Sequence, residues 1–311
     1  MHIPDGFLDA KTAVASGGLA AAGVGAALWQ AKRTLPARRV PLLGVTAAFI
    51  FAAQMLNFPV AGGTSGHLVG GVLAAVLVGP GAAIVVMTAV LLVQCFLFAD
   101  GGITALGANI FNMALVNVIA GYAIYRVIRR LVEGHRGLVL GAAFAGWFAT
   151  VLAAVCCAGQ VAWSGRINWR LIFPAMAGVH MLIGIGEGAI TALVLLAIAR
   201  VRPELVDRKD EAPQAVATVS YGLLVALGLA LFVSPFACAW PDGLEKVAAK
   251  LGFEQHALTT SLVATPFHGY RLPWFGDSGW ATAVAGVVGT LVAYVFAWFL
   301  ARMLVPKAKA S

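Results

Sequence analysis

The chain is a series of long apolar runs separated by short polar segments. About 20 apolar residues are needed to cross the ~30 Å hydrocarbon core of a bilayer, so each run predicts a membrane-spanning helix. The run 68–99 is too long for one crossing, and Gly79-Pro80-Gly81 divides it in two, because proline and glycine interrupt helical hydrogen bonding. The predicted spans are 12–31, 40–56, the two halves of 68–99, 105–128, 138–163, 171–199, 219–239 and 280–304.

Composition supports a membrane protein. Of the 311 residues, 61% are hydrophobic and 11% are charged, whereas soluble domains are ~45–50% apolar and ~25% charged. A soluble enzyme, an extracellular disulfide scaffold and a disordered tail are excluded. The prediction is an all-α polytopic membrane protein with a seven-span core (1–200) and a two-span tail (219–311) that carries a long external loop. The proline-containing, mixed-charge segment 201–218 is expected to be a cytoplasmic linker.

The basic residues predict the orientation of the chain. With the N-terminus outside and nine crossings, 15 of the 21 Lys and Arg residues fall inside and 6 fall outside. Positive residues concentrate on the cytoplasmic side of membrane proteins, so we expect an N-out, C-in, multi-pass protein in the inner or cell membrane of a bacterium or archaeon. The net charge of +8 is therefore a topology signal. The bilayer is the expected partner, and nucleic acid is not.

The first two residues form a potential metal chelate. The α-amine of Met1, the deprotonated amide nitrogen of His2 and the His2 imidazole can bind one metal ion through adjoining five- and six-membered rings. A fourth nitrogen would complete a square-planar site, which favours Cu(II) or Ni(II) and also fits low-spin Co(II). The segment lacks the basic region of a cleavable signal, so Met1 is expected to remain. The alternative is that His2 is an ordinary exposed polar residue.

A glycine-rich polar loop, residues 57–67, ends in His67 on the same predicted side as Met1. A histidine at this position is either a helix cap or a metal ligand. Because a neutral imidazole is a common ligand of nickel and cobalt, His67 is the candidate for the fourth nitrogen.

Other polar residues lie near these motifs or inside apolar spans, where polar side chains usually face a bundle interior. His180 and Glu187 share one helix face, because seven residues make about two turns. Such residues either orient the metal ligands or form hydrogen bonds between helices. The candidates for contact with the ligands are Asp5, Asn57, Thr64, Ser65, Asn109, His180 and Glu187.

These motifs resemble a known family. Met1-His2-Ile3-Pro4-Asp5-Gly6 together with Gly63-Thr64-Ser65-Gly66-His67 resembles the nickel/cobalt substrate-binding (S) components of energy-coupling-factor transporters, the NikM/CbiM type. The core resemblance covers residues 1–200, and Pro241-Asp242-Gly243-Leu244-Glu245 resembles the PDGLE small-subunit domain often fused to it. The resemblance implies that Met1, His2 and His67 bind the metal. It also implies that ATPase subunits and a transmembrane coupling (T) subunit are separate chains.

Function follows as an expectation. The sequence contains no G-x-x-x-x-G-K-[ST], so we expect no enzymatic activity of its own and no resident cofactor, only a transported Ni(II) or Co(II). Nickel is favoured by the resemblance of Pro4-Asp5-Gly6 to the nickel members, and cobalt uptake for cobalamin synthesis is the alternative. A metal-dependent hydrolase using His67, His180 and Glu187 would lack H-E-x-x-H. An ion-driven secondary transporter is disfavoured because no internal repeat is found.

Overall fold

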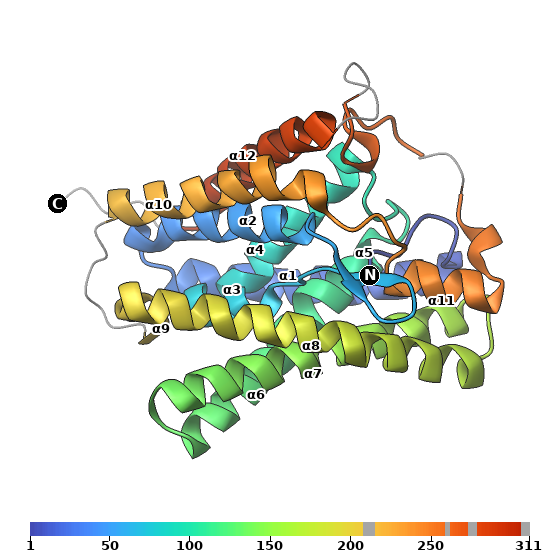
Figure 1. Ribbon diagram of the computed structural model, residues 1–311, viewed down its shortest axis with the longest axis horizontal. Coiled ribbons are helices and arrows are strands. Elements are labelled where there is room, and N and C mark those ends of the chain that lie inside the picture. The colour runs from blue at the N-terminus through green and yellow to red at the C-terminus, as the bar shows by residue number, and fades with distance from the viewer. Residues whose placement is uncertain (208–214, 259–261, 273–278, 306–311) are drawn as a thin grey trace.

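The computed structural model describes residues 1–207, 215–258, 262–272 and 279–305 and consists of helices packed side by side (Figure 1). The core helices are α1 (Ala10–Thr34), α2 (Val40–Gln54), α3 (Gly71–Val78), α4 (Pro80–Val93), α5 (Leu106–Asn109), α6 (Asn117–Leu131), α7 (Gly134–Trp163), α8 (Trp169–Val201) and α9 (Pro203–Asp207). The tail contains α10 (Ala215–Gly228), α11 (Gly243–Leu251) and α12 (Gly279–Leu304). Wider π-type turns at Gln94–Phe98, Ile110–Val116 and Leu229–Val233 extend three of these helices.

Seven helices in the described part of the chain are long and apolar enough to cross a bilayer. They are Ala10–Thr34, Pro80–Phe98, Leu106–Leu131, Gly134–Trp163, Trp169–Val201, Ala217–Phe236 and Gly279–Leu304. Five belong to the core and two to the tail. The predicted all-α, multi-pass membrane fold is confirmed.

Two of the nine predicted spans are shorter than a membrane-crossing helix. Helix α2 has 15 residues and α3 has 8, which correspond to about 22 Å and 12 Å of helix, so neither crosses a bilayer alone. The predicted break at Gly79-Pro80 is present, because Gly79 has φ 91° and Pro80 begins α4. The first half of the run 68–99 is not helical throughout: Leu68 and Val69 are buried in a loop, and Gly70, with φ 82°, precedes α3.

The predicted linker begins with a helical segment that packs on the core. Residues Pro203–Asp207 form the short helix α9, in which Val206 is buried and Leu205 packs on the core. This part of the linker is therefore partly buried against the core by its apolar side chains. Residues 208–214 of the linker lie outside the described residues.

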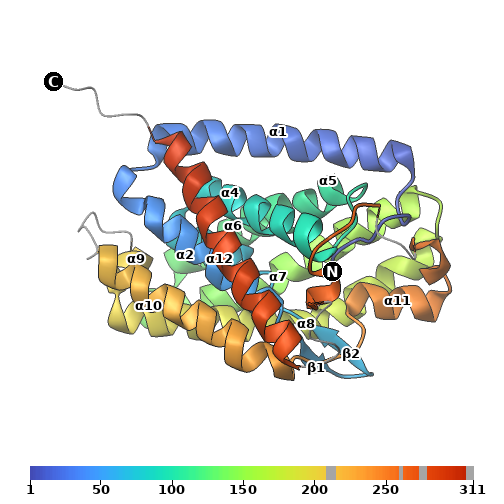
Figure 2. The same cartoon turned by 90° about the horizontal axis from the view of Figure 1, so that it is seen from above.

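The tail packs directly on the core. Helix α12 lies against α2 and α4, α10 lies against α2, and α11 lies against α8. Small residues allow this close approach: an added Cβ at Gly289 of α12 would overlap the Phe51 ring of α2. Figure 2 shows that the N-terminus, α11 and the hairpin of β1 (Phe58–Val60) and β2 (Thr64–Gly66) lie at one end of the molecule. The tail thus reaches the end where the candidate ligands lie.

Candidate metal centre

The N-terminal segment is buried and held by hydrogen bonds. Met1 is 4% exposed, and Ile3 is fully buried. The Ile3 amide donates to Asn109 Oδ1 at 2.8 Å, and Asn109 Nδ2 donates to the Ile3 carbonyl at 3.1 Å. The Gly102 amide donates to the same carbonyl at 2.8 Å. Asn109 therefore fixes the segment that carries the first two residues.

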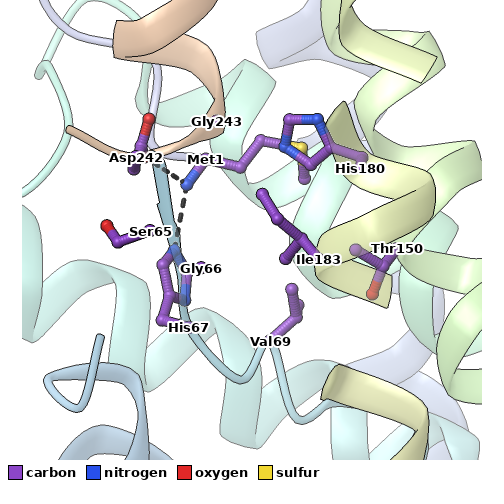
Figure 3. A pocket seen from close by; sticks show the side chains of 10 residues that line it. All are labelled: Met1, Ser65, Gly66, His67, Val69, Thr150, His180, Ile183, Asp242 and Gly243. Atoms are coloured by element: carbon purple, nitrogen blue, oxygen red, sulfur yellow. Dashed lines mark hydrogen bonds and ion pairs between the residues drawn. The ribbon is translucent and has the colours of Figure 1, made fainter. Parts of the chain in front are cut away.

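The α-amine of Met1 lies next to His67 (Figure 3). Its nitrogen is 2.9 Å from His67 Nε2, and His67 Nδ1 is 3.0 Å from the Leu68 carbonyl oxygen. A carbonyl only accepts, so Nδ1 carries the proton and Nε2 presents its lone pair to the amine. Metal–nitrogen bonds of about 2.0–2.1 Å at right angles place two nitrogens about 2.9 Å apart. The pair is therefore spaced as neighbouring ligands of one planar metal ion.

The His2 ring stacks on His67, with centroids 5.4 Å apart and planes 20° apart. Its Nδ1 is 3.1 Å from Asp100 Oδ1, and its Nε2 is 3.2 Å from Gln94 Oε1. The six-membered chelate ring would use Nδ1. Gln94 can therefore remain bonded to the other ring nitrogen and keep the ring oriented.

A chain of buried hydrogen bonds connects the segments that carry the two histidines. Gln94 Nε2 donates to Gln54 Oε1 at 2.8 Å, and Gln54 Nε2 donates to the Val69 carbonyl at 2.7 Å. The amides of Val69 and Gly70 donate to the Glu187 carboxylate at 2.5 and 3.0 Å. Glu187 thus contacts the loop that follows His67 and satisfies its non-helical backbone, which would otherwise be costly to bury.

The tail covers the same site. Asp242 Oδ2 accepts from the Met1 amine at 2.7 Å, so the amine lies between the Asp242 carboxylate and the His67 imidazole (Figure 3). The cavity beside these groups has a volume of about 10 Å³ and is lined by residues of the core and of the tail, including His180 and Gly243. This space holds about one water molecule.

The electrostatics of the site favour a neutral His67. Burial, together with the nearby ammonium of Met1 and with His2, lowers the pKa of His67 to about 3. Burial also lowers the pKa of His2. Burial disfavours the charged Met1 amine, but attraction and hydrogen bonding to Asp242 outweigh it and raise the pKa of this amine. The same ion pair holds the pKa of the Asp242 carboxyl below its usual range, although burial acts in the opposite direction.

The remaining predicted residues lie around the site rather than on the candidate ligands. Asp5 Oδ1 accepts from the amide and hydroxyl of Thr104 and so braces the N-terminal loop. The Asn57 carbonyl accepts from the Cys238 amide. These two residues connect loops, and no hydrogen bond or ion pair described for either side chain reaches Met1, His2 or His67.

Three further predicted residues lie against residues 240–243 of the tail. Ser65 Oγ donates to the Trp240 carbonyl and Thr64 Oγ1 donates to the Pro241 carbonyl. His180 Nδ1 is 2.9 Å from the Met176 carbonyl, and its ring lies beside Gly243. His180 and Glu187 share a face of α8, but each bonds to different backbone groups.

Sequence reasoning missed several residues of the site. Asp242 appeared only as part of the PDGLE motif, and Asp100 was not among the predicted residues. Gln54 and Gln94 are polar residues near the ends of apolar runs, which was the available signal. The Asp100 carboxylate also accepts from Tyr270 of the tail at 2.5 Å. Among the described residues, no three His, Cys, Asp or Glu side chains form a metal-binding cluster, so the candidate donor set depends on main-chain nitrogens.

The helical membrane fold and the nitrogen-rich N-terminal site define a transition-metal transport protein. The family "Cobalt uptake substrate-specific transmembrane region" matches residues 2–205, and the PDGLE domain matches residues 217–306. The chain belongs to this CbiM family and carries a fused PDGLE domain. It is a nickel/cobalt transport membrane protein of the CbiM/NikM type.

Curated relatives cover most of the chain. A chain of Archaeoglobus fulgidus that carries the name of a fused nickel transport protein, NikMN, is 39% identical over 97% of this chain and 98% of its own length. The fused nickel transport protein NikMN of Rhodobacter capsulatus is 33% identical over 86% of this chain and 82% of its own. A crystal structure of a transition metal transporter is 32% identical, with a TM-score of 0.59, over 72% of this chain and 99% of the other.

Proposed function

We propose that this chain is the substrate-binding membrane subunit of an ATP-driven importer and that its cargo is Ni(II). The observation that carries the proposal is the 2.9 Å separation between the Met1 amine nitrogen and His67 Nε2. The hydrogen bond from His67 Nδ1 to Leu68 supports it, because it leaves the coordinating nitrogen of the imidazole unprotonated.

Four nitrogens would bind the cargo. They are the Met1 amine, the amide nitrogen and Nδ1 of His2, and Nε2 of His67. The ammonium and the His2 amide each lose one proton when the metal binds, because only deprotonated nitrogens coordinate. The burial of both Met1 and His67 supports this assignment, since both lie in the interior beside one another.

Nickel is the proposed cargo over cobalt. Planar nitrogen coordination suits Ni(II), and relatives that include the tail are named as nickel transport proteins. A shorter relative, the cobalt transport protein CbiM 1 of Pelobacter propionicus, is 35% identical over 66% of this chain. Purified protein from cells grown with equal Ni(II) and Co(II) is expected to contain mainly nickel, and a cobalt excess would reverse the assignment.

Energy coupling requires other subunits. The chain has no P-loop motif, so the proposal assigns ATP hydrolysis to separate ATPase chains and force transmission to a T subunit. We place the protein in the inner or cell membrane of a bacterium or archaeon, with the N-terminal site on the outer face, as the distribution of Lys and Arg favours. In this scheme the chain has no catalytic residues and no resident cofactor.

The test is an extension of one alanine before Met1. It moves the α-amine out of the site and replaces it with a peptide nitrogen, so we expect loss of nickel binding and of the visible absorption of planar Ni(II). An alanine added after Ser311 serves as the control. Nickel binding of native affinity by the N-terminally extended protein would refute the proposed ligand set.

A further inference from the structure

Residues 240–243, here called the lid, form a short segment of the tail over the candidate ligands. Backbone carbonyls of the lid attach it to strand β2: the Ser65 amide donates to Pro241 at 2.8 Å, and Ser65 Oγ donates to Trp240 at 2.7 Å. Thr64 Oγ1 also donates to the Pro241 carbonyl at 3.1 Å. The lid is therefore anchored two residues away from His67.

Asp242 uses its two carboxylate oxygens for different partners. Oδ1 caps helix α11 by accepting from the amides of Leu244 and Glu245 at 2.8 and 2.9 Å. The Glu245 carboxylate accepts from the Asp242 amide at 3.0 Å and completes a capping box. The helix start thus fixes the carboxylate so that Oδ2 lies 2.7 Å from the Met1 amine.

Gly243 allows the lid to lie flat on the core. A Cβ at this position would be 2.7 Å from His180 Cε1 and 2.8 Å from Ile183 Cδ1, both on α8. The cavity under the lid is about 10 Å³, which is enough for one water molecule and too small for a hydrated metal ion. Cargo cannot reach the buried Met1 amine while the lid stays in this position.

We propose that residues 240–243 are a closing lid of the metal site and that the Asp242–Met1 ion pair keeps the lid closed whether the site is empty or occupied. The inference rests on the proposed function and adds a rule for exchange: the metal enters and leaves only when the lid moves away. The tail then governs the rate of loading and release, although it supplies no ligand.

Charge and proton balance explain why the ion pair persists. The empty site has one positive charge on the Met1 ammonium. In the occupied site, the two charges of Ni(II) and the negative amide nitrogen of His2 again sum to one positive charge, and two protons leave. The metal replaces the ammonium proton that points to His67 Nε2, and the coordinated amine keeps two N–H groups. One of these can still donate to Asp242 Oδ2.

The experiment measures nickel release. The purified full chain is loaded with Ni(II), mixed with excess EDTA, and followed by the absorption of planar Ni(II). Asp242→Asn retains a good helix-capping residue, but its single carbonyl oxygen cannot both cap α11 and accept from the amine. Since loss of such outer contacts typically costs 10–100-fold in metal affinity, we expect release at least about tenfold faster.

Four variants separate lid closure from folding of the tail. Asp242→Ser keeps a capping hydroxyl but cannot reach the amine, so its release is expected to be as fast as that of Asp242→Asn. Lys250→Gln changes an exposed side chain in the last turn of α11, away from Asp242 and Met1, and should release nickel at the wild-type rate. Gly243→Ala should release faster, whereas Gly228→Ala, a position with no neighbour within 4 Å in the same tail, should not.

Each outcome decides the inference. Wild-type release rates in Asp242→Asn and Gly243→Ala would overturn the lid while leaving the proposed function intact. A wild-type rate in Asp242→Ser with fast release in Asp242→Asn would show that Asp242 acts only through the helix cap, and would also overturn it. A wild-type protein that shows no bound nickel in the planar form would instead refute the proposed function.

Discussion

Two buried histidines face the same small cavity, and the difference between them explains the site. His67 and His180 each place Nδ1 against a backbone carbonyl, that of Leu68 and that of Met176 respectively. His67 Nε2 lies 2.9 Å from the Met1 amine, whereas the His180 ring lies beside Gly243 of the lid. Burial and an unprotonated nitrogen are common to both histidines, so these properties do not single out the proposed ligand. The position of the α-amine distinguishes the two.

The largest expected effect is that of His67→Ala. It removes one of the proposed nitrogen ligands, so nickel affinity should fall by more than the roughly 10–100-fold typical of an outer contact. Isothermal titration of purified protein with Ni(II) measures the change. A nickel affinity within tenfold of wild type would contradict the proposed role of His67 as a ligand.

The second effect is pH dependence. The pKa of the Met1 amine is raised, above all by Asp242 acting against burial, so protons compete with the metal below that pKa. His67, with a pKa of about 3, is already unprotonated and adds no competition near neutrality. Release of two protons predicts that nickel affinity rises about 100-fold per pH unit below the amine pKa, as titrations at pH 6 and pH 7 can measure. An affinity independent of pH would contradict the ammonium-to-ligand conversion.

A smaller effect is expected for Glu187→Gln. The Glu187 carboxylate accepts from two amides of the loop beside His67, and an amide side chain offers one acceptor oxygen for them. We expect nickel affinity to fall about tenfold with the planar absorption unchanged, because the ligand remains but its loop is less well positioned. Loss of the planar absorption would indicate that Glu187 has a more direct role.

The smallest effect is expected for His180→Ala. His180 lies beside the lid and forms no hydrogen bond with Met1, His2 or His67 among those described. Its loss should change nickel affinity by less than the roughly tenfold lower bound for an outer contact. A reduction as large as that of His67→Ala would show that the two histidines act alike.

The sequence predicted much of the fold because the apolar runs are long and Gly79-Pro80 is a strong helix break. It failed for Leu68 and Val69, which are apolar but lie in a buried loop. Gln54 and Glu187, distant in sequence, satisfy the backbone of Val69, and this tertiary compensation leaves no local signal.

The candidate site, like the fold, was predictable from the sequence only in part. Met1, His2 and His67 could be proposed from their chemistry and from a resemblance, and the structure brings Met1 and His67 together. Asp242 is 241 residues from Met1, and only the packing of α11 on α8 brings its carboxylate to the amine. The capping role of Asp242 is readable from its sequence, but its second partner is not.

X-ray absorption spectroscopy of the nickel-loaded full chain tests the central claim most directly. The account predicts a planar site with four nitrogen neighbours, two of them imidazole nitrogens, and no sulfur. A six-coordinate site rich in oxygen, or a bond from nickel to sulfur, would contradict it.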